Sequence, residues 1–159
     1  MKNPNSAKNL ARTQTREIVV LAHNIRSTHN IGAILRTSEG FGVAKIIFSG
    51  YSPFPTFTGE NFSETGRLPH LARKIHTQIG KTALDSHEIV PFELSRDISA
   101  TIRELKAQGF TVFALEQTTS SIQLPDLKLP PNAKVALLLG EEVEGIDEEL
   151  VKICDQALE

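Results

Sequence analysis

Three residues that could bind a ligand or take part in a reaction lie within Ser27–Gly42, which reads STHNIGAILRTSEGFG. Gly32 and Arg36 are four residues apart, so a helix places them on one face, and Asn30 stands just before them. Glycine inside a helix costs about 1 kcal/mol relative to alanine, so Gly32 predicts the close approach of another backbone or a ligand. Arg36 has a planar head with five donors, which suits phosphate. The alternative is a solvated face on which Arg36 pairs with Glu39, worth about 0.3 kcal/mol.

A second glycine pattern follows the apolar run at 134–139 and reads GEEVEGID. Gly140 and Gly145 have the separation of a P-loop, but Ile146 and Asp147 stand where that motif needs Lys and Ser or Thr. The dinucleotide fingerprint is also excluded, because its G-x-G is missing. The acids in the loop would repel phosphate, whereas a nucleoside with a cationic centre would tolerate them. The alternative is a plain turn before an acidic helix.

Polar side chains also gather directly after the first apolar run, in AHNIRSTHNIG. His23 and His29 suggest a metal, but a spacing of six fits neither a helical pair nor a tight turn, and no carboxylate is near in sequence. We therefore expect no metal ion. Arg26, in the same stretch, is a candidate contact for an anionic ligand.

Apolar runs alternate with helical patterns along the chain, which predicts an α/β domain with a mainly parallel sheet and helices on both faces. Ligands of such sheets bind where strands end and loops begin. Pro91 demotes one predicted strand to an edge or a strand end, and Thr28 or Asn30 is the expected N-cap of the first helix. The predicted strands are 17–23, 44–50, 87–94, 110–116 and 134–140, and the predicted helices are 27–42, 70–80, 96–109 and 146–155.

Length and composition fit one ordinary globular domain of 159 residues, with 40% hydrophobic and 23% charged residues. The lone Cys154 favours a reducing, cytoplasmic compartment, and we expect no membrane span. Net charge is −2, unevenly distributed. Residues 1–16 form a basic leader of charge +4, which is either an arm that touches phosphates or a solubilising tail, whereas 141–159 carry −7.

Taken together, the two glycine patterns resemble the motifs of the SpoU (TrmH-type) RNA 2′-O-ribose methyltransferases of the SPOUT superfamily. The first motif of that family stands here as Asn30-Ile-Gly-Ala-Ile-Leu-Arg-Thr37, and the second as Gly140, Glu142 and Gly145 after an apolar strand. Leu115, in VFALE, stands where the family lines its cofactor pocket. The resemblance implies a SPOUT-like α/β-knot fold and a homodimer with its active site at the subunit contact.

The resemblance also implies a reaction, the transfer of a methyl group from S-adenosylmethionine to a ribose 2′-hydroxyl of tRNA or rRNA, without a metal. By position, Arg36 acts on the hydroxyl, assisted by an RNA phosphate because arginine is a poor base, and Asn30 positions it. Glu142 is expected to brace its loop against Asn30. The implied RNA contacts are Arg26, Gly32 and Arg36, and the implied cofactor-binding residues are Leu115, Leu139, Gly140, Glu142, Gly145 and Ile146.

One departure from the family concerns the third motif, I-P-M followed by Ser-Leu/Phe-Asn, which is expected after ICDQALE, where the sequence stops at Glu159. We therefore expect a domain at 17–159 that lacks its last strand and helix, has an incomplete knot, binds the cofactor weakly and transfers no methyl group by itself. Two alternatives remain at this point. One is a non-catalytic RNA-binding paralogue or fragment of such an enzyme, and the other is a small-molecule binding protein unrelated to RNA.

Overall fold

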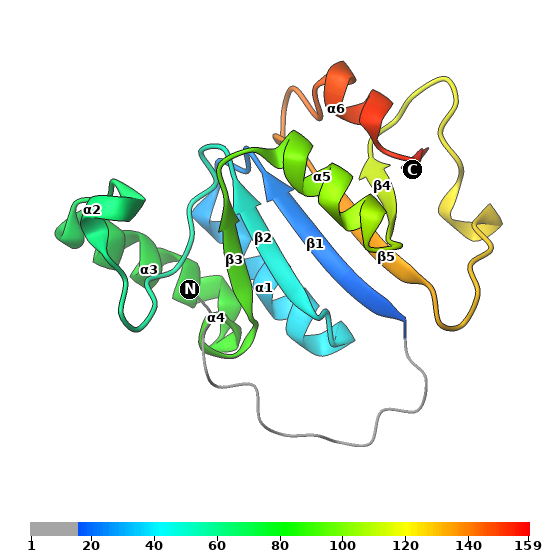
Figure 1. Cartoon of the computed structure of the whole chain (residues 1–159). Helices are drawn as coiled ribbons and strands as arrows, with labels where there is room; N and C mark the ends of the chain where they lie inside the picture. The colour runs from blue at the N-terminus through cyan, green and yellow to red at the C-terminus, as the bar shows by residue number, and fades with distance from the viewer. Residues whose placement is uncertain (1–15) are drawn as a thin grey trace.

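Six strands pair in parallel in the order β3-β2-β1-β5-β4-β6 in the computed structural model, which describes residues 16–159 (Figure 1). All their carboxyl ends therefore lie at one edge of the sheet, as the sequence predicted for its ligand site. The strands are β1 Glu17–His23, β2 Lys45–Ser49, β3 Phe92–Ser95, β4 Thr111–Leu115, β5 Lys134–Leu139 and β6 Gln156–Leu158.

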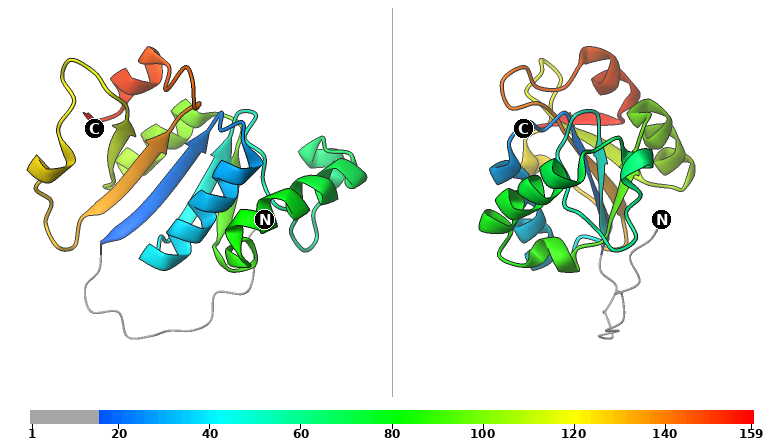
Figure 2. Two further views of the ribbon diagram at one scale, coloured as in Figure 1. Left: turned by 180° about the vertical axis from the view of Figure 1, so that it is seen from behind. Right: turned by 90° about the vertical axis from the view of Figure 1, so that its left-hand side faces the viewer.

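Helices cover both faces of this sheet, which confirms the predicted layers (Figure 2). α1, α3 and α4 lie on one face, and α5 and α6 lie on the other. No helix within residues 16–159 is long and apolar enough to cross a membrane. The helices are α1 Thr28–Phe41, α2 Phe62–Thr65, α3 Pro69–Ala83, α4 Ser86–Ile89, α5 Ile98–Ala107 and α6 Glu148–Ile153, with a 3₁₀ turn at Leu124–Asp126.

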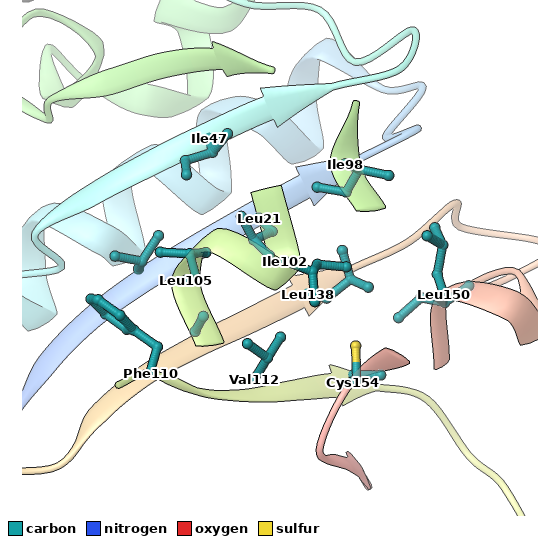
Figure 3. Packing of buried hydrophobic residues seen from close by; sticks show 14 residues of the cluster. Leu21, Ile47, Ile98, Ile102, Leu105, Phe110, Val112, Leu138, Leu150 and Cys154 are labelled. Atoms are coloured by element: carbon teal, nitrogen blue, oxygen red, sulfur yellow. The ribbon is translucent and has the colours of Figure 1, made fainter. Parts of the chain in front are cut away.

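The central strands are apolar on both sides because each side faces a helix layer. Successive residues of β1 alternate between the layers: Leu21 packs in the core under α5 and α6 (Figure 3), whereas Val20 packs in the core under α1 and α3. Cys154 lies in the first of these cores, and burial raises the pKa of its thiol to about 11. The core thiol is therefore protonated at neutral pH and unreactive as a nucleophile.

The N-cap of helix α1 lies before both residues that the sequence favoured, one residue before Thr28 and three before Asn30. Ser27 is its N-cap, and the Ser27 side chain accepts a hydrogen bond from Asn30 N at 3.3 Å. Thr28 and Asn30 are therefore not caps, and Asn30 keeps its side chain for another partner. The predicted end is confirmed, because Gly42 closes the helix in the left-handed conformation with φ 66°.

The strand predicted over 87–94 is wrong in its first half. Residues Ser86–Ile89 form the short helix α4, closed by a hydrogen bond from Val90 N to Ser86 O, and the strand starts only after Pro91. Proline restricts the residue before it and offers no N–H, so the ladder begins beyond it. The resulting β3 is an edge strand, as Pro91 indicated.

The two ends of the chain differ from each other in what the structure describes. The leader lies outside the described residues except Arg16, whose guanidinium donates to Leu129 O at 3.0 Å. At the other end a short β6 is present where no strand was expected. It lies between β4 and residues 122–124, because Glu116 N donates to Leu158 O while Ile122 N donates to Ala157 O.

Gly32 marks the place where α1 touches α3. A Cβ added at Gly32 would lie 2.0 Å from Thr82 Oγ1 and 2.5 Å from the backbone oxygen of Ile79. The close approach predicted at this glycine is real, but α3 makes it. Gly32 is buried, so the RNA contact expected there is corrected to a helix-packing position.

Gly32→Ala should therefore lower the free energy of unfolding, by about 1–3 kcal/mol as in other overpacked cores, although alanine is the better helix former. Gly40→Ala is the matched control, since it lies in the same helix and a Cβ there meets nothing within 4 Å. The control should be neutral or stabilising by up to about 1 kcal/mol. Urea unfolding of both variants measures the difference, and equal effects would contradict this packing role.

Candidate active site

A cavity of about 390 Å³ lies where β4 and β5 end. Five of the six predicted cofactor-binding residues line it: Leu115, Leu139, Gly140, Glu142 and Gly145. The sixth, Ile146, is only 7% exposed and packs in the core below α6, so it supports the loop from beneath instead of lining the cavity. The remaining lining residues are Glu116, Glu141, Val143 and Glu144.

The floor of the cavity is the loop Gly140–Gly145, which folds tightly back on itself. Glu141 and Gly145 exchange two backbone hydrogen bonds of 3.0 Å. A Cβ on Gly140 would lie 2.6 Å from Gly145 O, so only glycine allows this closure. Gly145 has φ 76°, and a Cβ there would meet the carboxylate of Glu116 at 2.3 Å. Both glycines are thus required by the backbone of the loop itself.

Two carboxylates hold the loop from inside by accepting backbone N–H groups. Glu141 Oε2 accepts from Val143 N at 2.8 Å and from Glu144 N at 2.6 Å. Glu116 Oε2, at the end of β4, accepts from Ile146 N at 2.8 Å. The amides of Glu144 and Val143 hold the pKa of the Glu141 carboxyl below its usual value, so it is ionised at neutral pH.

Glu142 joins this loop to the start of α1. Its carboxylate accepts from the Asn30 side-chain nitrogen at 2.8 Å, from Arg26 N at 3.1 Å and from Ser27 N at 3.2 Å. Burial opposes ionisation of Glu142, but these hydrogen bonds outweigh it and lower its pKa. The expected brace between Glu142 and Asn30 is therefore present, and the two sequence motifs meet through it.

Arg26 lies at the outer rim of the site, as an exposed side chain. Its guanidinium is 3.2 Å from Glu141 Oε1 and 6.0 Å from the centre of the Tyr51 ring. A hydrogen bond with Tyr51 and the charge of Glu141 raise the pKa of Arg26. Arg26 thus remains a candidate RNA contact, held between an acid and an aromatic ring.

Arg36 does not line the cofactor cavity. Six residues of helix separate it from Asn30 by about 9 Å along the axis and about 120° around it. It lines a second hollow of about 540 Å³ on the α1–α3 side, together with Phe41, Lys81 and Leu84. The proposed ion pair with Glu39 is not formed, because Glu39 accepts a hydrogen bond from Ser86. Across residues 16–159 the guanidinium of Arg36 makes no hydrogen bond or ion pair, and it stays available for a ligand.

The chemistry of the cavity fits a nucleoside with a positive charge. Its wall is backbone and aliphatic at Leu115 and Leu139, which suits an adenine ring. Four glutamates line it, so the local field favours a cation such as a sulfonium. S-adenosylmethionine combines these two features, and the residues present therefore fit the predicted cofactor.

Sequence reasoning missed three residues that build this site: Ser27 as the cap of α1, and Glu116 and Glu141 as acceptors for the loop amides. A signal did exist for the two acids. A tight glycine loop exposes several N–H groups, and a neighbouring carboxylate is a natural acceptor for them.

The hydrogen bond between Asn30 and Glu142 can be measured with a double-mutant cycle of Asn30→Ala and Glu142→Ala. We expect a coupling of about 0.5–1 kcal/mol in the free energy of unfolding, at the low end because both side chains are exposed. Since the folded pKa of Glu142 is depressed, this coupling is present above pH 4.5 and disappears as the pH falls through the lowered pKa. Glu144→Ala paired with Asn30→Ala is the control and should be additive. A cycle as additive as the control at pH 7 would refute the link.

Comparison with known proteins shows which family and which relatives the chain resembles. The family model described as "SpoU rRNA Methylase family" matches residues 67–159. A tRNA (guanosine(18)-2′-O)-methyltransferase of Thermus thermophilus is 28% identical over 144 residues, covering 89% of this chain and 61% of that protein. A 23S rRNA (guanosine-2′-O-)-methyltransferase of Neisseria meningitidis is 26% identical, covering 87% of this chain and 46% of that protein. The chain thus spans about half to three fifths of the length of these relatives.

Solved structures share the fold. An rRNA methyltransferase from Sinorhizobium meliloti superposes with a TM-score of 0.69 at 21% identity, covering 92% of this chain and 48% of that one. The A. aeolicus TrmH/SpoU tRNA modifying enzyme gives 0.66, also at 21% identity, covering 92% and 63%. The chain therefore shares the fold of these structures, and because the family model covers more than half of the sequence, the chain belongs to the SpoU rRNA methylase family.

Proposed function

We propose that this protein takes part in S-adenosylmethionine-dependent 2′-O-methylation of a ribose in tRNA or rRNA, in the cytoplasm. The observation that carries the proposal is the Glu142 bridge, which fixes the helix of Arg36 to the loop of the cofactor cavity. The names of the two curated relatives describe the same reaction class on tRNA and on rRNA. Both motifs are complete in the sequence and adjacent in space.

Each part of the site has a distinct role in the proposed reaction. Bound S-adenosylmethionine would supply the methyl group by displacement at its sulfonium carbon. Leu115, Leu139 and the loop Gly140–Gly145 would hold the nucleoside end. The fixed loop would also align the reacting carbon, and such alignment supplies a large share of the rate enhancement in group transfers. Arg36 would bind the RNA near the target ribose and help remove the 2′-hydroxyl proton, with a phosphate as its partner.

The separate positions of Arg36 and the cavity support a homodimer in which one chain supplies the arginine and its partner the cofactor. The surface around Arg36 carries two exposed apolar side chains, Phe41 and Leu84, which are 80% and 59% exposed. Exposed apolar side chains beside a functional cation are typical of an interaction surface. We propose that a second copy of the chain covers this surface.

In a SpoU enzyme that contains this domain together with the third motif, Arg36→Ala should lower kcat for transfer of labelled methyl groups to tRNA or rRNA by about 100-fold or more, the usual effect of removing a proton-transfer group. RNA affinity should fall only slightly, since one phosphate contact is lost among several. Arg103→Ala is the matched control, because it removes the same charge from an exposed position on α5. Retained transfer in the Arg36 variant, or equal losses in both variants, would refute the catalytic role and leave an RNA-binding module.

The dimer proposal is tested by mixing two inactive variants, Arg36→Ala and Leu115→Lys. The new lysine lies in the wall of the cavity and should repel a sulfonium, while its half-exposed position leaves the core intact. If Arg36 serves the partner's cavity, a mixed dimer contains one intact site and transfer returns. If it serves its own chain, both sites stay defective. Each variant alone is the control, and calorimetry with S-adenosylmethionine confirms that only Leu115→Lys loses the cofactor.

A further inference from the structure

A cluster of nitrogen and oxygen ligands lies where α3 meets α4, on the sheet face that also carries α1 and away from the cofactor cavity. It consists of His76 from α3 and of His87 and Glu88 from α4, and one ligand atom from each lies within 4.8 Å of the others. We propose that these three side chains form a binding site for a divalent transition ion, with Zn²⁺ as its occupant.

The distances within the cluster fit a metal better than they fit hydrogen bonds. Glu88 Oε1 lies 3.4 Å from His76 Nε2 and 3.5 Å from His87 Nε2. Hydrogen bonds between such groups are centred near 2.8–2.9 Å. Two ligands of a tetrahedral zinc ion, each about 2.0–2.1 Å from the metal, lie about 3.3 Å apart. Two of the three distances between ligand atoms therefore already match those around a zinc ion, and the third is at most 4.8 Å.

The second nitrogen of His76 has the partner that metal-bound histidines need. Nδ1 of His76 lies 3.1 Å from Thr56 Oγ1. A hydrogen bond on the far nitrogen fixes the ring orientation and the tautomer, so that Nε2 presents its lone pair to the metal. Thr56 belongs to the long loop between β2 and α2. Its contact with His76 therefore connects this loop to α3.

His87 is held in place by the backbone around it. The His87 ring packs against Gly80, one helical turn after His76. A Cβ on Gly80 would lie 3.2 Å from the His87 Cε1 atom. Leu84 and Asp85 both adopt left-handed conformations, with φ 48° and 71°, in the turn that returns the chain onto α3. Such conformations are strained outside glycine, and this turn places the two histidines beside each other.

His87 is held largely by burial. Its side chain is only 8% exposed, and its Nδ1 atom is buried without a hydrogen bond within the described structure. The ion would bind the other ring nitrogen, Nε2, which is the atom that faces Glu88. Glu88, in contrast, is 62% exposed, so the fourth corner of the site faces solvent and a water molecule can complete the tetrahedron.

The ligand set determines which ion fits. Two imidazoles and one carboxylate suit Zn²⁺ and exclude the hard ions Mg²⁺ and Ca²⁺, which take oxygen ligands. The guanidinium of Arg67 is the nearby cation, and it lies 2.6 Å from the carboxylate of Glu60, so its charge is balanced locally. Cys154 takes no part, since it is buried in the core on the opposite face of the sheet.

The test consists of two titrations of the metal-free chain. Binding of Zn²⁺ alone is measured by isothermal calorimetry, and binding of Co²⁺ is measured by the visible absorption of its tetrahedral form. We expect one ion per chain and a higher melting temperature in Zn²⁺ that EDTA reverses. His76→Gln and His87→Gln should each weaken binding about 100-fold. Thr56→Val should weaken it about tenfold, because it removes only the hydrogen bond to the far nitrogen of a ligand.

His70→Gln is the matched control, since His70 lies exposed in the same helix and should bind the ion as wild type does. Melting curves in EDTA show whether each variant folds. If wild type binds no stoichiometric ion, or if His76→Gln and His70→Gln bind equally well, the proposal is wrong. The expectation of no metal ion rested on the spacing of His23 and His29, and this site uses neither.

Discussion

The Glu142 carboxylate is the constraint on which the arrangement of the site depends. Three N–H groups from the start of α1 converge on it, and its own backbone belongs to the loop after β5. The carboxylate therefore has two roles. It accepts hydrogen bonds at a helix N-terminus, and it connects the segments that follow the neighbouring strands β1 and β5. Helix N-termini favour negative charge, so the bridge is stabilised by the helix itself as well as by the individual hydrogen bonds.

The bridge acts only because the loop beneath it is rigid. The loop Gly140–Gly145 closes on two backbone hydrogen bonds and on the carboxylates of Glu141 and Glu116. Each of these acids neutralises N–H groups that a tight turn would otherwise leave without partners. A cavity wall made of backbone that is already satisfied keeps its shape when a ligand enters, which is the condition for aligning a reacting carbon.

Sequence patterns predicted β1, β2, β4 and β5, the two-sided core and most residues that line the cavity, because apolar alternation and strand-end glycines act locally. They did not predict the partner of Gly32. The spacing indicates that something approaches this glycine, but whether it is RNA or Ile79 of α3 depends on a contact between distant segments. The pair His76 and His87 escaped notice for the same reason. Its approach depends on the left-handed turn at Leu84 and Asp85, which neither residue type announces.

For the proposed function, the acidity of the site also decides from which side RNA would approach. Glu116, Glu141 and Glu142 are each occupied by backbone amides, but their negative charge remains beside the cavity. Phosphates are repelled there, while Arg36 and Lys81 line the hollow between α1 and α3. In the proposed function, an RNA strand would therefore be drawn to the α1–α3 surface, and only its target ribose would need to reach the acidic rim, where a cationic cofactor would be held. In the proposed dimer, the cationic surface of one chain would thus bind the polyanion beside the acidic cavity in which its partner would hold the cation.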